Sequence, residues 1–299
     1  MLESFTLIIF LIGVGTLMKR SRSFPENTAA VLNMFVLRVS LPAMILISIP
    51  SLPISSAIIF PVLSHWVLYG LNIVLVLWAC SIFKFSRSVK GALLIVSCLG
   101  NTAFLGTPMV TLFWGAKAVP YAVLYDQLGS GLAFIGTMAF LVPRYSSQEK
   151  KSLSGALYGL LKFPPFIALI FGFIFIYLPM PTLLELLFKN ISVTLIPCAM
   201  IAVGYQMKYR LSKQQLVPLG VGLTIKLIIL PTIAFLFVKI SGLQHLALSV
   251  SVLQSGMPPM ITAGALAMSV NLENDLSTSL VGYGLIIAFI TLPLLNYII

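Results

Sequence analysis

The chain has 299 residues, of which 59% are hydrophobic and only 8% are charged. Its mean hydropathy of +1.08 excludes a soluble globular domain and indicates an all-helical integral membrane protein. The formal net charge of +11 does not point to a nucleic-acid partner. The positive charges gather in short loops between apolar segments, which is the pattern that sets the topology of a membrane protein.

Ten apolar segments approach the roughly 20 residues that a helix needs to cross a bilayer. They are residues 3–18, 28–49, 57–83, 91–113, 118–142, 155–178, 184–205, 216–238, 244–268 and 277–298. We therefore predict ten transmembrane helices joined by short loops. The first is expected to be retained, because the acidic Glu3 precedes it and its basic residues follow it, the reverse of a cleavable signal peptide.

The basic residues concentrate in alternate loops. Twelve of the 18 Lys and Arg residues lie in four such loops: Lys19, Arg20 and Arg22; Lys84, Arg87 and Lys90; Arg144, Lys150 and Lys151; and Lys208, Arg210 and Lys213. Loops rich in Lys and Arg stay in the cytoplasm. We therefore expect a multi-pass protein of the cell (inner or plasma) membrane with both termini on the extracytoplasmic side.

Ten helices can divide into two repeats of five, residues 1–150 and 151–299. An odd number of helices inserts the second repeat upside down relative to the first. Pro42 and Pro197 lie 155 positions apart in similar contexts, LPAM and IPCAM. The same offset carries Gly100–Asn101 onto Ser255–Gly256. Two matches at one offset favour an inverted repeat.

The fourth and ninth segments are interrupted near their middles by polar residues, glycine and proline. The interruptions are GNTAFLGTP, from Gly100 to Pro108, and LQSGMPPM, from Leu253 to Met260. Unwound backbone survives in a membrane only where it lines a protected cavity. Paired interruptions in corresponding halves are the best sequence indication of a transporter binding site. The alternative is a pair of proline kinks with a structural role only.

The two interruptions supply the predicted binding residues. In the first, Gly100, Gly106 and Pro108 would shape the break, and Asn101 and Thr102 would contact substrate. In the second, the binding candidates are Gly256, Met257, Pro258 and Pro259. Each break creates a half-helix whose N-terminus carries free N–H groups and a partial positive charge, which suits an anion.

Three charged residues lie well inside apolar segments, namely Arg38, Asp126 and Lys226. An ionisable residue at that depth is a functional candidate, and we assign these three, with Gln127, to coupling or gating. Their charges sum to one positive, which favours an anionic substrate. The alternative is structural pairing of Asp126 with Lys226, and a pair that breaks in one state could itself act as a gate or proton relay.

Other reactive residues give weaker signals. His65 and His245 are expected at the outer membrane interface, and Cys80, Cys98 and Cys198 as buried apolar side chains. We predict no cofactor, no metal site and no enzymatic activity, because no nucleophile–base pair or metal-ligand spacing is present. Asp126 is the one clear carboxylate inside the segments, so sodium coupling is weakly supported.

The ordered set of motifs resembles the auxin efflux carrier family, and specifically its short bacterial members. The resemblance rests on NTAFLGTP with Gly115, KLIILP, MPPMITAG and NLENDLST, together with LPAM and YDQ. It runs over nearly the full length. It implies two inverted five-helix repeats in which the broken helices 4 and 9 cross. Helices 1, 2, 6 and 7 would form a scaffold domain, and helices 3–5 and 8–10 a mobile transport domain.

The resemblance also implies a homodimer formed through the scaffold and an Asn101 side chain that contacts a substrate carboxylate. Arg38 matches no family motif. We therefore predict a secondary transporter, a permease or efflux carrier, that moves a small organic anion by elevator-type alternating access. The second reading is a sodium-coupled, bile-acid-like organic anion symporter. A non-transporting receptor and a membrane enzyme remain further alternatives.

Overall fold

The computed structural model describes residues 2–21, 23–146, 155, 158–159, 161–206 and 215–299. Six basic residues used to predict the topology lie outside this described part, namely Arg22, Lys150, Lys151, Lys208, Arg210 and Lys213. Contacts divide the chain into two compact units. Unit 1 comprises Met1–Ile54, Ala103–Val123 and Tyr158–Met207, and unit 2 comprises Ser55–Thr102, Leu124–Leu157 and Lys208–Ile299.

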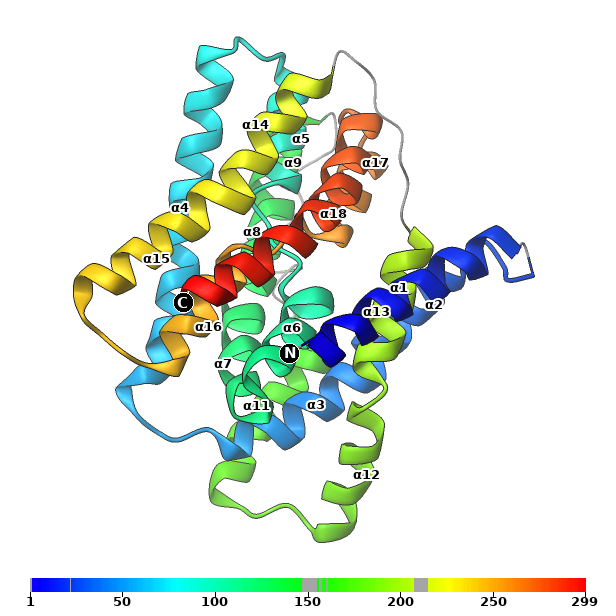
Figure 1. The fold of residues 1–299 in the computed structure, drawn as a ribbon, viewed down its shortest axis with the longest axis vertical. Coiled ribbons are helices and arrows are strands. Elements are labelled where there is room, and N and C mark those ends of the chain that lie inside the picture. The colour runs from blue at the N-terminus through cyan, green and yellow to red at the C-terminus, as the bar shows by residue number, and fades with distance from the viewer. Residues whose placement is uncertain (1, 22, 147–154, 156–157, 160, 207–214) are drawn as a thin grey trace. The chain divides into compact units, whose positions relative to one another are not determined.

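Unit 1 is built entirely from helices in its described part (Figure 1). They are α1 (Leu2–Ser21), α2 (Thr28–Phe35), the π-helical η1 (Val36–Ser40), α3 (Leu41–Ser48), α6 (Thr107–Trp114), α11 (Pro164–Tyr177), α12 (Thr182–Ser192) and α13 (Leu195–Gln206). Short 3-10 turns, η2 (Ile49–Ser51) and η5 (Ala116–Ala118), follow α3 and α6. The chain then enters α7 (Val119–Leu124), which runs on into unit 2.

Small residues set the close packing of unit 1. Helix α1 lies along α13 (Figure 1), and one glycine of each helix lies against the backbone of the other helix. A Cβ on Gly15 would lie 2.1 Å from the carbonyl oxygen of Ile201, and one on Gly204 would lie 2.1 Å from that of Ile12. Without a hydrophobic drive between helices in lipid, such backbone-to-backbone approach supplies much of their association.

A second contact in unit 1 joins α3 to α11 and α12. A Cβ on Gly172 would lie 2.9 Å from Cβ of Ile49, so this glycine allows α11 to lie against the end of α3. At the other end, the hydroxyls of Ser40 and Thr194 are 2.7 Å apart. A hydroxyl pair of this kind supplies a polar bond between helices that lipid cannot replace.

Unit 2 is also helical throughout its described part, apart from loops and one short bridge described below. It holds the 3-10 turn η3 (Ser56–Ile58), α4 (Ile59–Ile82), α5 (Arg87–Val96), η6 (Tyr125–Gly131), α8 (Leu132–Gly136), η7 (Thr137–Leu141), α9 (Val142–Tyr145), α14 (Leu216–Thr224), η9 (Ile225–Ile229), α15 (Leu230–Ser241), α16 (Leu246–Ser255), α17 (Ile261–Ser269) and α18 (Asn274–Ile298). The π-helical η4 (Thr102–Gly106) joins the end of this unit's first part to α6.

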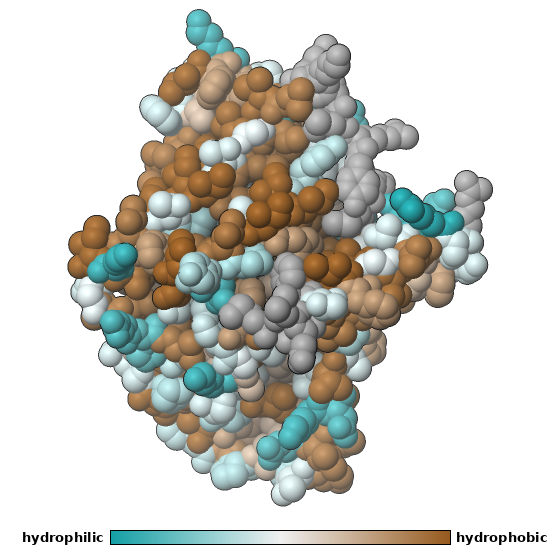
Figure 2. All heavy atoms as spheres, in the orientation of Figure 1, coloured by the Kyte–Doolittle hydropathy of each residue, from teal (hydrophilic) through white to brown (hydrophobic). Residues whose placement is uncertain are grey.

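Five helices of the described chain are long and apolar enough to cross a membrane. They are Thr28–Ser51, Ser56–Ile82, Thr182–Gln206, Leu216–Ser241 and Asn274–Ile298. Large apolar side chains lie on the surface, among them Trp78, Phe140 and Phe237, and brown, hydrophobic residues cover much of the face in Figure 2. The all-helical membrane class predicted from composition is confirmed. Shorter apolar helices occupy Thr102–Trp114, Pro164–Tyr177 and Leu246–Ser255.

Several helices change to the wider π form just before a proline. The π segments η1, η4, η7 and η9 each end two residues before one: Pro42, Pro108, Pro143 and Pro231. Proline cannot donate to the carbonyl four residues earlier, and its ring clashes with that carbonyl. Widening the helix is one way to relieve the clash, and such segments are frequent at functional sites.

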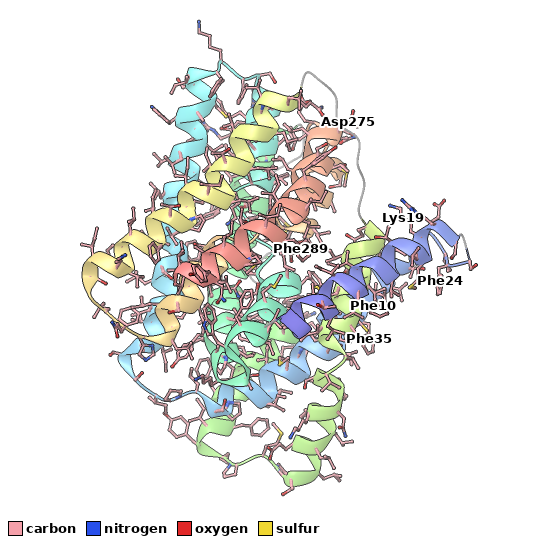
Figure 3. The ribbon with its side chains drawn as sticks, viewed as in Figure 1. Phe10, Lys19, Phe24, Phe35, Asp275 and Phe289 are labelled. Carbon is pink, nitrogen blue, oxygen red and sulfur yellow. The ribbon has the colours of Figure 1, made fainter. Side chains whose placement is uncertain are left out.

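Charges at the helix ends agree with the helix dipole. Lys19 and Arg20 occupy the last turn of α1, and Asp275 occupies the first turn of α18 (Figure 3). Cations are favoured at C-terminal ends and anions at N-terminal ends, by about 0.3–1 kcal/mol each at a surface. The acidic Asp275 therefore has a local structural reason.

The glycine contact between α1 and α13 predicts a large difference between two neighbouring glycines. Gly15→Ala places a methyl group against backbone that cannot move aside, whereas a Cβ on Gly13 meets nothing within 4 Å. Overpacking of this kind typically costs about 1–3 kcal/mol. We expect Gly15→Ala to lower the melting temperature of the detergent-purified protein by several degrees and Gly13→Ala to leave it unchanged. Equal melting temperatures for the two variants would contradict the packing described here.

Candidate functional site

Two interrupted helices of unit 2 meet in a short antiparallel bridge. Helix α5 ends at Val96 and α16 ends at Ser255, and the chain is helical again from Thr102 and from Ile261. Between these ends, Gly100 lies opposite Pro259. The amide of Asn101 donates to the carbonyl of Pro258 at 2.7 Å, and the amide of Met260 donates to that of Leu99 at 2.9 Å.

The sequence explains why this bridge forms where it does. Pro258 and Pro259 have no N–H, so they cannot continue α16. In the bridge neither needs to donate, because the two bonds use the amides of Asn101 and Met260. Gly100 lies close to two side chains: a Cβ there would press on Nζ of Lys226 at 3.2 Å and touch Cβ of Met257 at 3.5 Å. The unwound segments thus satisfy part of each other's backbone.

The bridge joins the two interruptions that the sequence offset of 155 relates. That offset carries Gly100 onto Ser255, and the antiparallel bridge sets Gly100 opposite Pro259, four residues further along the second interruption. An antiparallel pairing does not fix which residues of two repeats correspond, so the offset of 155 stays a prediction.

Asn101 lies at the bridge between the two interrupted helices, called the crossing below, and its side chain is buried without hydrogen bonds. It is 1% exposed, and neither its Nδ2 nor its Oδ1 has a hydrogen-bond partner. The amide of Gln254, which is fully buried, donates to the carbonyl of Thr102 at 3.3 Å, while its Oε1 has no partner. Buried polar atoms without partners are rare in native structures. Here two amide side chains carry such atoms at the same crossing.

Lys226 brings a positive charge to the bridge. It lies on η9, is 5% exposed, and its Nζ donates to the carbonyl of Ser255 at 3.1 Å. That carbonyl belongs to the last residue of α16, at the negative end of the helix dipole, which favours a cation. The same ammonium group lies against Gly100, so it borders the residue next to Asn101.

Asp126 lies on η6 and is 5% exposed. Its Oδ1 accepts a short bond from the Thr102 hydroxyl, and its Oδ2 accepts one from Nε2 of Gln127 at 2.6 Å. The side-chain hydrogen bonds of Asp126 and of Lys226 thus run to other groups. The structural pairing of these two residues, kept open from the sequence, is not what their bonds show.

Most of the sequence candidates belong to unit 2, and three belong to unit 1. Gly100, Asn101, Thr102, Asp126, Gln127, Lys226, Gly256, Met257, Pro258 and Pro259 all belong to unit 2. Gly106, Pro108 and Arg38 belong to unit 1, and Arg38 is exposed on η1. Met257 is fully buried, and Gly256 leaves room for Leu295 of α18, since a Cβ there would lie 3.0 Å from its Cδ2.

His65 is buried inside the protein, which its predicted place at the membrane interface did not anticipate. It is 4% exposed on α4, and its ring stacks with Tyr69 and meets Tyr125 edge-on, with centroids 6.0 and 4.9 Å away. Its depth in the membrane stays a prediction. A signal was available, because His65, Tyr69 and Asn72 recur at a spacing of four and three residues and so share one face of a helix. His245 instead caps α16, accepting from the amide of Ala247 at 3.1 Å.

A small polar cavity lies among these residues. It is lined by His65, Leu68, Tyr69, Asn72, Cys98, Tyr125, Lys226, Leu230 and Ser255. Its volume of about 10 Å³ is near the least that holds one water molecule. Nε2 of His65 and Oδ1 of Asn72 have no partner, whereas Nδ2 of Asn72 donates to the carbonyl of Ser97 at 3.1 Å. The cavity is thus polar enough to hold water.

The fold and this crossing define a multi-pass membrane protein with a buried polar site between broken helices. A family model described as "Membrane transport protein" matches residues 1–296. The chain is also similar to an "Uncharacterized transporter" of Methanothermobacter thermautotrophicus, at 25% identity over 301 residues, covering 99% of this chain and 98% of the relative. A second relative, the "Uncharacterized transporter MJ1031" of Methanocaldococcus jannaschii, is 27% identical over 263 residues, covering 84% and 83%.

The chain therefore belongs to the membrane transport protein family, the auxin efflux carrier family that its motifs resemble. It is a transporter and not an enzyme.

The bond between Thr102 and Asp126 predicts a specific loss of stability. Thr102→Val keeps the shape of the side chain and removes the hydroxyl that donates to the buried carboxylate. Hydrogen bonds to charged groups contribute about 1.5–3 kcal/mol. We expect Thr102→Val to lower the melting temperature and Thr102→Ser, which keeps the hydroxyl, to restore most of it. If both variants melt like the parent protein, the bond does not stabilise the site.

Proposed function

We propose that this transporter is a secondary carrier, a permease or efflux carrier, for a small organic anion, most simply a carboxylate. The observation that carries the proposal is the Asn101 side chain, whose amide nitrogen and oxygen are both buried and without partners. An amide N–H is a suitable donor to a carboxylate oxygen. A substrate that fills this position would remove the cost of leaving the side chain unpaired, about 1–3 kcal/mol.

Charge at the crossing supports an anion rather than a cation. Lys226 supplies an ammonium group beside Gly100, and the carboxylate of Asp126 is already occupied by Thr102 and Gln127. The chain resumes its helical path at Thr102 and at Ile261, where the N–H groups of a first helical turn have no partner inside the helix. Such N-termini favour negative charge.

The arrangement of the helices supports an inverted repeat and an elevator-type movement. The bridge pairs the interruptions of two helices in opposite directions, which is compatible with a two-fold axis in the membrane plane. Unit 1 gathers helices from residues 1–54 and 158–207, which correspond to helices 1, 2, 6 and 7, and unit 2 gathers helices 3, 8, 9 and 10. In the proposal unit 1 contains the scaffold and dimer interface, and unit 2 carries the site.

Residues 103–123 differ from this division, because they group with unit 1. They include the second half of helix 4 and the start of helix 5, both assigned to the transport domain by the resemblance. The continuous helical path through η4 and through α7–η6 crosses the boundary twice. In the proposal the chain would bend at these two places, η4 and α7–η6, when unit 2 moves.

The driving force has two candidates. A single charge moved across 100 mV is worth about 2.3 kcal/mol, so a membrane potential that is negative inside can drive an anion out without coupling. Alternatively, Asp126 takes up and releases a proton during transport. In the proposed orientation both termini are extracytoplasmic, and Lys84, Arg87, Lys90 and Arg144 lie in the cytoplasm. A potential that is negative on the cytoplasmic side then drives an anion outward, which is export.

A sodium-coupled, bile-acid-like organic anion symporter is the second candidate. It is favoured by the unpartnered oxygens Oδ1 of Asn101 and Oε1 of Gln254, because hard cations are bound by oxygen ligands. The neighbouring ammonium of Lys226 opposes it. Ligand-dependent stability with and without sodium separates the two candidates.

Binding can be tested by thermal stability across a panel of mono- and dicarboxylates, each with and without sodium. A ligand present at 100 times its dissociation constant stabilises the folded protein by about 2.7 kcal/mol. We expect one class of acids to raise the melting temperature of the parent protein without sodium, and Asn101→Ala to abolish that rise.

Asn33→Ala, on α2 of unit 1, is the matched control and should keep the rise. A rise that survives in Asn101→Ala would remove Asn101 from the site. A rise that needs sodium would favour the symporter, and binding without flux in liposomes would indicate a receptor.

The role of Asp126 can be tested by flux. Asp126→Asn keeps the size of the side chain and cannot take up a proton in the same range. If Asp126 couples transport to protons, the variant should still move the identified acid under a membrane potential but should lose its response to a pH gradient. A response equal to that of the parent protein would mean that Asp126 has a structural role only.

A further inference from the structure

His65 is connected to Asp126 by an unbroken row of hydroxyl groups. Nδ1 of His65 lies 3.4 Å from Oγ of Ser130, and that oxygen lies 3.0 Å from Oγ1 of Thr102. Thr102 in turn bonds Oδ1 of Asp126. All four side chains are at most 5% exposed, so water does not compete along the row. The four residues come from α4, η4 and η6, which lie far apart in the sequence.

The chemistry of the groups fixes how the protons are arranged. An ionised carboxylate is an acceptor only, so it takes the one hydroxyl proton of Thr102. Thr102 then accepts from Ser130, and Ser130 accepts from the N–H at Nδ1 of His65. When Asp126 is protonated, it becomes the donor, every bond in the row reverses, and His65 accepts at Nδ1 and carries its proton at Nε2. The charge of Asp126 thus determines which ring nitrogen of His65 carries the proton.

His65 also lines the small polar cavity. Nε2 of His65 has no partner, and the cavity that it lines holds room for about one water. The titratable groups around this ring are Lys226, Cys98, Tyr69 and Tyr125 on the cavity wall, with Asp126 at the end of the hydroxyl row. Gly129 makes the position possible, because a Cβ there would lie 2.5 Å from Cγ of His65.

We propose that His65, Ser130 and Thr102 form a proton relay between this cavity and Asp126. A proton enters at Nε2 of His65 from the cavity water, the proton at Nδ1 passes to Ser130, the proton of Ser130 passes to Thr102, and that of Thr102 passes to Asp126. Each hydroxyl gains one proton and loses one, and Asp126 becomes neutral. The inference rests on the proposed coupling role of Asp126 and adds the path by which its proton arrives.

The relay can be tested without any substrate. The chain has two histidines, so His245→Asn, which keeps a capping oxygen for α16, leaves His65 as the one imidazole. Its two ring nitrogens are then followed by 15N NMR of histidine-labelled protein in lipid nanodiscs at alkaline pH. Asp126→Asn is added to place an amide donor where the protonated acid would be.

We expect His65 to carry its proton at Nδ1 in the His245→Asn background and at Nε2 once Asp126→Asn is added. Adding Ser130→Ala should abolish this change, because it removes the middle of the row. Ser251→Ala should preserve it. Ser251 is equally buried, but its hydroxyl bonds the carbonyl of Ala247 in its own helix at 2.7 Å. If Ser130→Ala fails to fold, Thr102→Val breaks the row at the next link and should give the same result.

An unchanged tautomer on Asp126→Asn, or a change that persists in both Ser130→Ala and Thr102→Val, would overturn the relay. Neither result would touch the anion site, which the acid-dependent melting temperature of the parent protein reports separately. Conversely, a protein that binds no acid but shows the linked tautomer would retain the relay and lose the proposed function.

Discussion

The structure depends on one constraint, that backbone inside a membrane must find partners within the protein. A helix interrupted by proline loses some of its own bonds, and each unpartnered group costs several kcal/mol in lipid. Here two interrupted helices of unit 2 supply each other, through the amides of Asn101 and Met260. The bridge therefore makes both interruptions tolerable together, and neither would be stable in this form alone.

The bridge pairs backbone groups but leaves polar side-chain atoms without hydrogen bonds. The backbone is paired, yet Asn101 and Gln254 keep buried side-chain atoms without partners. Lys226 is held close by through a bond to the last carbonyl of α16. The three charged residues predicted inside the segments, Arg38, Asp126 and Lys226, all lie on π-helical stretches. For Arg38 and Lys226, a proline following the π stretch explains that geometry.

Much of this was readable from the sequence, because composition, loop charges and paired proline interruptions are local signals. They gave the helical membrane class, the positions of both breaks and the polar candidates at them. The pairing between the two interruptions was not readable, because apolar helices look alike at every turn and no local signal sets Gly100 opposite Pro259. Partners distant in sequence were also hidden. Ser130 and Gly129 can contact His65 only because η6 packs against α4.

We propose that the bridge between the two interrupted helices is a transport site for a small organic anion. The most direct measurement is exchange of labelled mono- and dicarboxylates into proteoliposomes containing the parent protein or Asn101→Ala. We expect exchange of one class of acid by the parent protein and loss of that exchange in the variant, with both proteins equally reconstituted and equally folded. Equal exchange by the two proteins, or none with any acid, would contradict it.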